Sequence, residues 1–257
     1  MRDLRFIELE PDGPIATVWL DRPPVNATDT QLYNEIHHVF SHVDDYLPDA
    51  RALVLAGRGP HFCAGNDLAE FQTMDPDNAP ERLRTAREAF WAIYDSPTPV
   101  IAAVHGVAVG SGLAIAASCD LVVAAQGARF ATPEVNVGVL GGAKHLSRLV
   151  PQGVVRLMHY TGDLYPAEQL QAYGGIVSVV PADQLLEESR KLARSIARHS
   201  PVALRLAKQS LNGIEYLPLK PGYEFEQGLT RQLSGYDDAK EAVNAFLERR
   251  PPHYTGR

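Results

Sequence analysis

Two glycine-containing stretches decide how this chain folds: Gly59-Pro60-His61-Phe62-Cys63-Ala64-Gly65-Asn66-Asp67-Leu68 and His105-Gly106-Val107-Ala108-Val109-Gly110-Ser111-Gly112-Leu113. Each follows a short apolar run typical of a buried strand, at 52–56 and 100–104, and the second leads into a helical pattern. A glycine turn between a strand and a helix leaves backbone N–H groups without internal partners at the edge of a sheet. Two such N–H groups that converge on one carbonyl oxygen would form an oxyanion hole, which stabilises an enolate or a tetrahedral anion.

Either turn alone could be an ordinary tight connection, because glycine supplies turns in every fold class. The occurrence of both turns at corresponding strand ends favours a site over two unrelated connections. The segment Gly110-Ser111-Gly112 does not belong to a dinucleotide-binding fingerprint, since the chain lacks the G-x-G-x-x-G pattern with its partner acid. We therefore expect chemistry on a carbonyl group rather than nucleotide-dependent redox chemistry.

The composition is that of an ordinary globular protein. The chain has 257 residues, of which 45% are hydrophobic, and a net charge of −7, which argues against nucleic-acid binding. A phosphate group would need local arginine or lysine side chains for its binding. Two cysteines, Cys63 and Cys119, and an N-terminus without a long apolar run predict a cytoplasmic protein with no membrane span.

The order of the expected elements predicts an α/β fold. A hairpin at 5–9 and 14–20 is followed by alternating helices and strands, which is typical of parallel βα units: 28–46, 52–56, 81–94, 100–104, 111–118 and 120–125. From 143 onward the pattern is helical except for a short apolar run at 176–180, with helices expected at 143–150, 152–161, 166–172, 183–199, 201–213, 222–234 and 237–249. This change indicates a mixed core followed by a helical appendage.

Four motifs, in this order and spacing, resemble the crotonase (enoyl-CoA hydratase/isomerase) superfamily: 61–68, 105–112, Cys119-Asp120 and Phe130-Ala131-Thr132-Pro133-Glu134-Val135-Asn136-Val137-Gly138. The resemblance implies a spiral of ββα units, with an acyl-CoA core at 1–195 and a C-terminal helical trimerisation region at 196–257. It also implies a homotrimer or a hexamer built as a dimer of trimers. The substrate would be an acyl-CoA thioester, with no metal and no cofactor beyond the coenzyme A moiety.

The resemblance also assigns roles to individual residues. The oxyanion donors would be the backbone N–H groups of Asn66 and Ser111, and the general acid/base would be Glu134, whose pKa burial should raise. Without the resemblance, Glu134 would more often be a helix N-terminal charge or a surface residue, and Arg22 could equally be a phosphate contact or an exposed turn residue. The residues expected to contact the substrate are Arg22, Ala64, Asp67, Leu68, Gly110, Ala114, Gly142 and His145.

The chain departs from the family pattern at Ala114, where two-glutamate hydratases carry their second carboxylate. One carboxylate suffices for a 1,3-proton transfer, so the departure favours double-bond isomerisation. Hydration stays open, with a single glutamate or with a second polar group from Asp67, Asn136 or His145. Gly142 replaces the aspartate of dienoyl-CoA isomerases. The remaining alternatives are an acyl-CoA hydrolase or decarboxylase of the same superfamily, and a non-catalytic relative that binds acyl-CoA.

Overall fold

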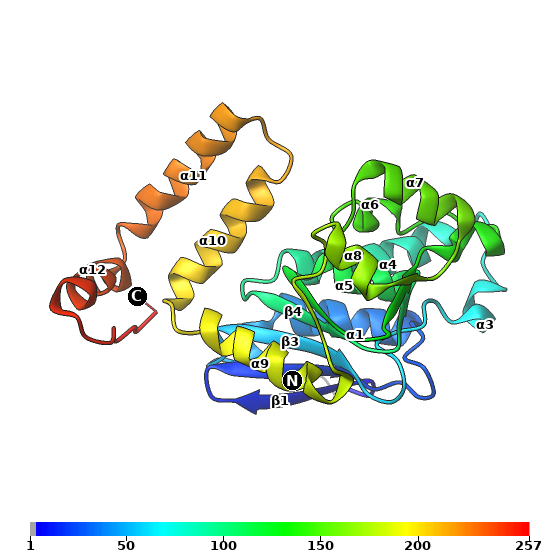
Figure 1. Ribbon diagram of the computed structural model, residues 1–257, viewed down its shortest axis with the longest axis horizontal. Helices are drawn as coiled ribbons and strands as arrows, with labels where there is room; N and C mark the ends of the chain where they lie inside the picture. The colour runs from blue at the N-terminus through cyan, green and yellow to red at the C-terminus, as the bar shows by residue number, and fades with distance from the viewer. Residues whose placement is uncertain (1–3, 257) are drawn as a thin grey trace.

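The computed structural model describes residues 4–256, which form two sheets surrounded by helices (Figure 1). The larger sheet has six strands in the order β1-β2-β3-β4-β6-β9, and only β1 and β2 pair antiparallel. Its strands are β1 Ile7–Asp12, β2 Ile15–Leu20, β3 Ala52–Gly57, β4 Val100–Val104, β6 Leu121–Ala125 and β9 Ser178–Val180. The predicted α/β class is confirmed.

A second, three-stranded sheet has the order β5-β7-β8, with β5 at Val107–Val109, β7 at Arg129–Ala131 and β8 at Tyr165–Pro166. The sequence did not reveal this sheet. Its strands have only two or three residues, which is too short to show the period-two pattern of a strand. One of them, β5, lies inside the second glycine stretch and separates Gly106 from Gly110.

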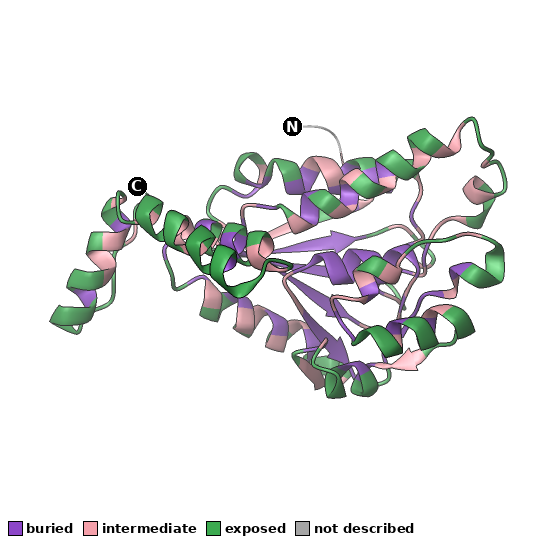
Figure 2. Cartoon of the chain, turned by 90° about the horizontal axis from the view of Figure 1, so that it is seen from above, coloured by how far each residue is buried: buried purple, intermediate pink, exposed green. Residues whose placement is uncertain are grey.

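The larger sheet is buried on both faces, which explains why its strands have continuous apolar sequences. Alternate residues of β3 belong to two separate clusters: Leu53 and Leu55 face the cluster that includes α1 Thr30–Ser41 and α4 Ala79–Tyr94, whereas Val54 faces α9 Leu185–Ile196. This division follows from the alternation of side chains along a strand. Figure 2 shows these buried strands between the helical layers.

Several predicted helices have the expected limits, including α5 Ser111–Ser118 and α7 Gln152–Thr161. The first helix is capped by Asp29, whose carboxylate accepts a hydrogen bond from the Leu32 N–H at 2.8 Å. That helix is shorter than predicted, since the chain breaks at His42 before the short α2 Val43–Tyr46. The other helices are α3 Leu68–Phe71, α6 Ala143–Leu146, α8 Ala167–Ala172, α10 Pro201–Ile214, α11 Leu219–Leu233 and α12 Asp237–Glu248.

Other predicted limits also differ from the structure: the helix predicted at 183–199 spans Leu185–Ile196, and the helix predicted at 222–234 begins at Leu219. The hairpin turn lies after Asp12, because Pro11 and Asp12 pair with β2 as strand residues. The helix predicted at 143–150 ends at Leu146. The chain then continues in turns, in which the Arg148 N–H donates to the His145 carbonyl at 3.0 Å and the Leu149 N–H to the Leu146 carbonyl at 2.9 Å.

The last three helices, α10, α11 and α12, lie to one side of the sheet in Figure 1. The first of them is joined to the core by Lys208, whose ammonium group lies 2.8 Å from the Asp120 carboxylate and donates to the Ile93 carbonyl at 3.1 Å. Exposed apolar side chains of these helices include Leu219, Phe246 and Leu247. The boundary at 195/196 and a trimeric or hexameric assembly stay predictions. Among residues 4–256, no helix has the length and apolar character that crossing a membrane requires.

The two glycine stretches are in direct contact. The Cys63 N–H donates to the Val107 carbonyl at 3.1 Å, and the Val109 N–H donates back to the Cys63 carbonyl at 3.1 Å. The first turn of α5 also lies against this segment, because a Cβ atom on Gly112 would lie 2.2 Å from the Cys63 carbonyl oxygen. Gly65, with φ of +103°, then turns the chain toward Asn66. Backbone pairing and this close approach therefore fix the two turns relative to each other.

We predict that Gly112→Ala destabilises the protein by about 2 kcal/mol, because the methyl group must displace backbone atoms in a packed interior. Urea unfolding at matched protein concentration measures the change. The control is Gly153→Ala in α7, where an added Cβ meets no atom within 4 Å. The control should be as stable as the wild type or slightly more so. Equal unfolding midpoints for Gly112→Ala and the wild type would contradict the close approach.

Candidate active site

Two cavities meet at Glu134. The smaller cavity has a volume of about 120 Å³ and its lining includes Ser111, Ala114 and Gly142. The larger cavity has a volume of about 560 Å³ and its lining includes Ala64, Asp67 and Leu68. Residues that line both cavities mark the junction, and they include Asn66, Gly110 and Glu134. A ligand that occupied both cavities would pass this junction.

Two backbone donors are available at the junction. Ser111 is the first residue of α5, so its N–H has no partner within the helix, and Asn66 follows the turn at Gly65. Neither N–H donates a hydrogen bond to any group among residues 4–256. Both residues line the smaller cavity. Free N–H groups in such a position can bind a carbonyl oxygen and stabilise negative charge on it.

Glu134 is a buried carboxyl group with an unused oxygen. It lies in a short 3-10 helix, Pro133–Val137, and is 8% exposed. Its Oε2 atom is buried without a hydrogen-bond partner among the described residues. Burial raises the pKa of Glu134, and a hydrogen bond from its own backbone N–H and the charge of His159 oppose this increase only in part. A buried carboxyl of raised pKa with one free oxygen is suited to accept and return a proton.

Glycines leave the space that the Glu134 carboxyl occupies. A Cβ atom on Gly142 would lie 2.8 Å from Glu134 Oε1, and one on Gly110 would lie 3.5 Å from it. Both glycines have positive φ angles, +72° and +55° respectively. Ala114 lines the same cavity and is 2% exposed. A methyl group therefore stands at the position where, by the family resemblance, two-glutamate hydratases carry their second carboxylate.

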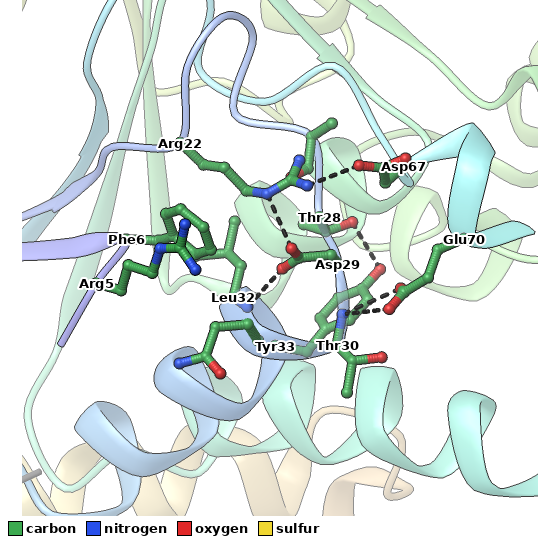
Figure 3. Close-up of polar contacts among 12 residues, drawn as sticks. Arg5, Phe6, Arg22, Thr28, Asp29, Thr30, Leu32, Tyr33, Asp67 and Glu70 are labelled. Carbon is green, nitrogen blue, oxygen red and sulfur yellow. Dashed lines mark hydrogen bonds and ion pairs between the residues drawn. The ribbon is translucent and has the colours of Figure 1, made fainter. Parts of the chain in front are cut away.

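Arg22 lines the larger cavity and already has two anionic partners (Figure 3). Its guanidinium binds Asp29 at 3.0 Å and Asp67 at 2.7 Å, and it also donates to the Ala27 carbonyl at 2.8 Å. The hydrogen bond from Arg22 is the main cause that lowers the pKa of Asp67. Arg22 is therefore not a free turn residue, and its predicted contact with the substrate would use the N–H groups that remain.

His145 lies behind the wall of the smaller cavity rather than in its lining. Its ring packs edge-on against Phe90, with 5.0 Å between centroids, and Phe90 lines the cavity. Burial, with Arg148 and Lys144 nearby, lowers the pKa of His145 to about 4, so the ring is neutral near pH 7. The predicted substrate contact of His145 would require Phe90 to move.

Thr28 and Tyr33, which were not expected at the site from the sequence, connect the two donor residues. The Ser111 and Thr28 hydroxyls lie 2.7 Å apart, Thr28 donates to the Tyr33 hydroxyl at 2.9 Å, and Tyr33 donates to Asn66 Oδ1 at 2.6 Å. The helical spacing of Tyr33, Ile36 and Phe40 is the sequence pattern that could have indicated a buried position for Tyr33. That spacing turns the tyrosine inward, where its hydroxyl needs a partner.

Comparisons with known proteins place the chain in one enzyme family. Residues 10–257 match the family described as enoyl-CoA hydratase/isomerase. The (7aS)-7a-methyl-1,5-dioxo-2,3,5,6,7,7a-hexahydro-1H-indene-carboxyl-CoA hydrolase of Rhodococcus jostii is 37% identical over 94% of this chain and 93% of its own length. The 2,3-dehydroadipyl-CoA hydratase of Escherichia coli is 35% identical over 90% of this chain and 89% of its own. The crystal structure of an enoyl-CoA hydratase from Bacillus anthracis has a TM-score of 0.92 at 28% identity, covering 98% of this chain and 100% of that one.

The fold and the site thus define an enzyme of acyl-CoA esters. The chain belongs to the enoyl-CoA hydratase/isomerase family, that is, to the crotonase superfamily. The family resemblance and the crotonase-like fold predicted from the sequence are confirmed. The assignment of individual site residues stays a prediction.

The raised pKa of Glu134 predicts a pH-dependent effect of Glu134→Gln on stability. The folded state binds this proton more tightly than the unfolded chain, so ionisation costs stability as the pH rises through the raised pKa. The variant cannot ionise, and its free energy of unfolding should exceed that of the wild type at pH 8. The difference should vanish below about pH 4, where the glutamate is protonated in both states.

Urea unfolding across this pH range tests the prediction. The exposed Glu168, in the first turn of α8, provides the control variant Glu168→Gln. That variant should not reproduce the pH-dependent gain. A wild type more stable than Glu134→Gln at pH 8 would show that the carboxylate has a stabilising partner.

The Thr28–Tyr33 connection predicts a second effect, on catalysis. Tyr33→Phe removes the hydroxyl between Thr28 and Asn66, so the Asn66 donor should be less well positioned. We expect kcat for an enoyl-CoA ester to fall by about tenfold with little change in KM, which is less than the effect of deleting an oxyanion donor. Tyr173→Phe, at an exposed position after α8, is the control. An unchanged kcat in Tyr33→Phe would exclude a positioning role.

Proposed function

We propose that this protein isomerises the double bond of a 3-enoyl-CoA to the conjugated 2-enoyl-CoA, with Glu134 as the only acid/base. The observation that carries the proposal is one buried carboxyl at the junction whose Oε2 has no partner among the described residues, in a cavity that the two donor residues and the Ala114 methyl group also line. The acyl group would occupy the smaller cavity, and the coenzyme A side of the thioester would occupy the larger one.

The proposed reaction moves one proton in two steps. The thioester oxygen accepts hydrogen bonds from the Asn66 and Ser111 N–H groups. The Glu134 carboxylate removes a proton from C2, and the electron pair delocalises into the thioester as an enolate held by these donors. The protonated Glu134 then returns the proton to C4, which leaves the double bond between C2 and C3. No water and no second carboxyl group is needed.

The environment of Glu134 supports this role. A general acid/base acts best when its pKa is near the working pH, because it must both take and give the proton. Burial shifts the pKa of Glu134 upward, in the required direction. The mobile proton would also stay on this carboxyl, since Oε2 has no other partner among residues 4–256.

Hydration of a 2-enoyl-CoA is the second candidate, and Glu70 is the observation that favours it. Glu70 lines the smaller cavity with Glu134, and its carboxylate oxygens accept the Thr30 N–H at 3.1 and 3.2 Å (Figure 3). A second carboxyl group there could hold the attacking water. Asp67 is less suited, because it lies on the larger cavity and binds Arg22. Several relatives are named as hydratases, among them that of Escherichia coli.

The two reactions change the absorbance of the conjugated thioester in opposite directions. We expect 3-hexenoyl-CoA to gain this absorbance, and crotonyl-CoA, which hydration would consume, to keep it. Glu134→Gln should lower kcat by about 10²–10⁴-fold, the usual contribution of a general acid/base. Glu168→Gln is the control and should retain full activity.

Three outcomes would contradict the proposal. Loss of crotonyl-CoA absorbance that depends on both Glu134 and Glu70 would establish hydration by two carboxyl groups. Release of free coenzyme A thiol would indicate a hydrolase, as the Rhodococcus jostii relative is named. If no ester reacted but acyl-CoA esters raised the melting temperature, the protein would be a binding relative without catalysis.

A further inference from the structure

The smaller cavity is apolar over most of its surface beyond the junction with the larger one. Phe71 and Met74 contribute to it, and α4 adds Leu83, Ala86 and Phe90. Such a lining favours the hydrocarbon part of an acyl group. That part of the lining also holds two charged side chains, and one of them, Glu70, has its carboxylate held by the Thr30 N–H. The other charged side chain therefore needs an explanation.

Arg82 is that charged side chain. It lies in the first half of α4, is partly buried and lines only the smaller cavity, so it belongs to the part of the site away from the thioester. Its guanidinium donates to the Glu70 backbone carbonyl and to the Thr73 hydroxyl, the latter at 2.8 Å. A guanidinium carries more N–H donors than these two contacts use.

The charge of Arg82 is not neutralised by an ion pair. In the part of the chain that the structure describes, no carboxylate pairs with it, whereas Arg22 binds Asp29 and Asp67. Arg84, on the same helix, binds Glu81 and Glu88. Glu70 contacts Arg82 through its backbone carbonyl, and its carboxylate accepts the Thr30 N–H instead. Arg82 thus brings a positive charge without an ion-pair partner to a cavity whose α4 wall is otherwise apolar.

We propose that Arg82 binds an oxygen acceptor at the far end of the acyl group, a carboxylate or a ketone. This inference rests on the proposed placement of the acyl group in the smaller cavity. A guanidinium forms strong hydrogen bonds to such oxygens, and partial burial strengthens them. A plain hydrocarbon end would offer no acceptor to the N–H groups of Arg82 that Glu70 and Thr73 leave unused. The preferred substrates are then oxygenated acyl-CoA esters rather than simple fatty acyl-CoA esters.

The test compares three saturated esters that the enzyme cannot isomerise: hexanoyl-CoA, 5-oxohexanoyl-CoA and adipyl-CoA. Calorimetric titration of the full-length protein measures their affinities without any turnover. We expect 5-oxohexanoyl-CoA, adipyl-CoA or both to bind about tenfold or more tightly than hexanoyl-CoA, the usual effect of a hydrogen bond to a charged group. A preference for adipyl-CoA alone identifies a carboxylate, and equal preference for both identifies any oxygen acceptor.

Arg82→Met keeps the unbranched stem of the side chain but removes its charge. It should abolish the preference and leave hexanoyl-CoA binding unchanged, whereas loss of a purely structural contact would weaken all three esters alike. The control is Arg87→Met, an exposed position of α4 outside the cavity, where the guanidinium lies over the Trp91 ring. This control should keep the wild-type preference.

Equal affinities of the wild type for the three esters would overturn the role of Arg82 and leave the acyl-CoA site intact. A preference that survives in Arg82→Met would overturn it as well. Failure of all three esters to bind would instead overturn the placement of an acyl-CoA ester in this site, and the inference with it.

Discussion

The structure depends on one constraint: the backbone of Cys63 pairs with β5, and the first turn of α5 lies directly on it. Two hydrogen bonds to Val107 and Val109 fix the segment that leads to Asn66. Gly112 fixes the helix that begins at Ser111, because no side chain fits between the helix and the Cys63 carbonyl. The two free N–H groups are therefore positioned by backbone geometry, which does not rearrange when charge develops on a bound carbonyl.

The same site makes the ionised form of Glu134 energetically unfavourable. A buried carboxyl group with an unpartnered oxygen is destabilising when ionised, and burial raises its pKa for this reason. Gly110 and Gly142 give it room but no hydrogen bond. Such a cost is typical of functional sites, where stability and activity oppose each other. The hydrogen bonds of the Thr28 and Tyr33 hydroxyls help to position the donor residues, and they do not neutralise Glu134.

Much of the fold and part of the site could be predicted from the sequence, and the failures have physical causes. Long periodic segments such as 111–118 and 152–161 gave correct helices, whereas the strands of the second sheet were too short to show a period. Glu134, Asn66 and Ser111 were recognised from motifs and meet at one junction. His145 was expected in the lining, but it lies behind Phe90, since the orientation of a short helix such as α6 depends on its packing.

The sequence by itself determined the family, the α/β class and the residue types at the reacting centre, because glycine turns and a glutamate after proline are local patterns. Only the tertiary structure decided the surroundings of that centre. Tyr33 and Thr28 join Asn66 and Ser111 across long stretches of chain, and Arg82 reaches the smaller cavity without a carboxylate partner, whereas Arg22 has two. Such pairings depend on which distant segments pack together, and a pattern within a single segment does not predict this packing.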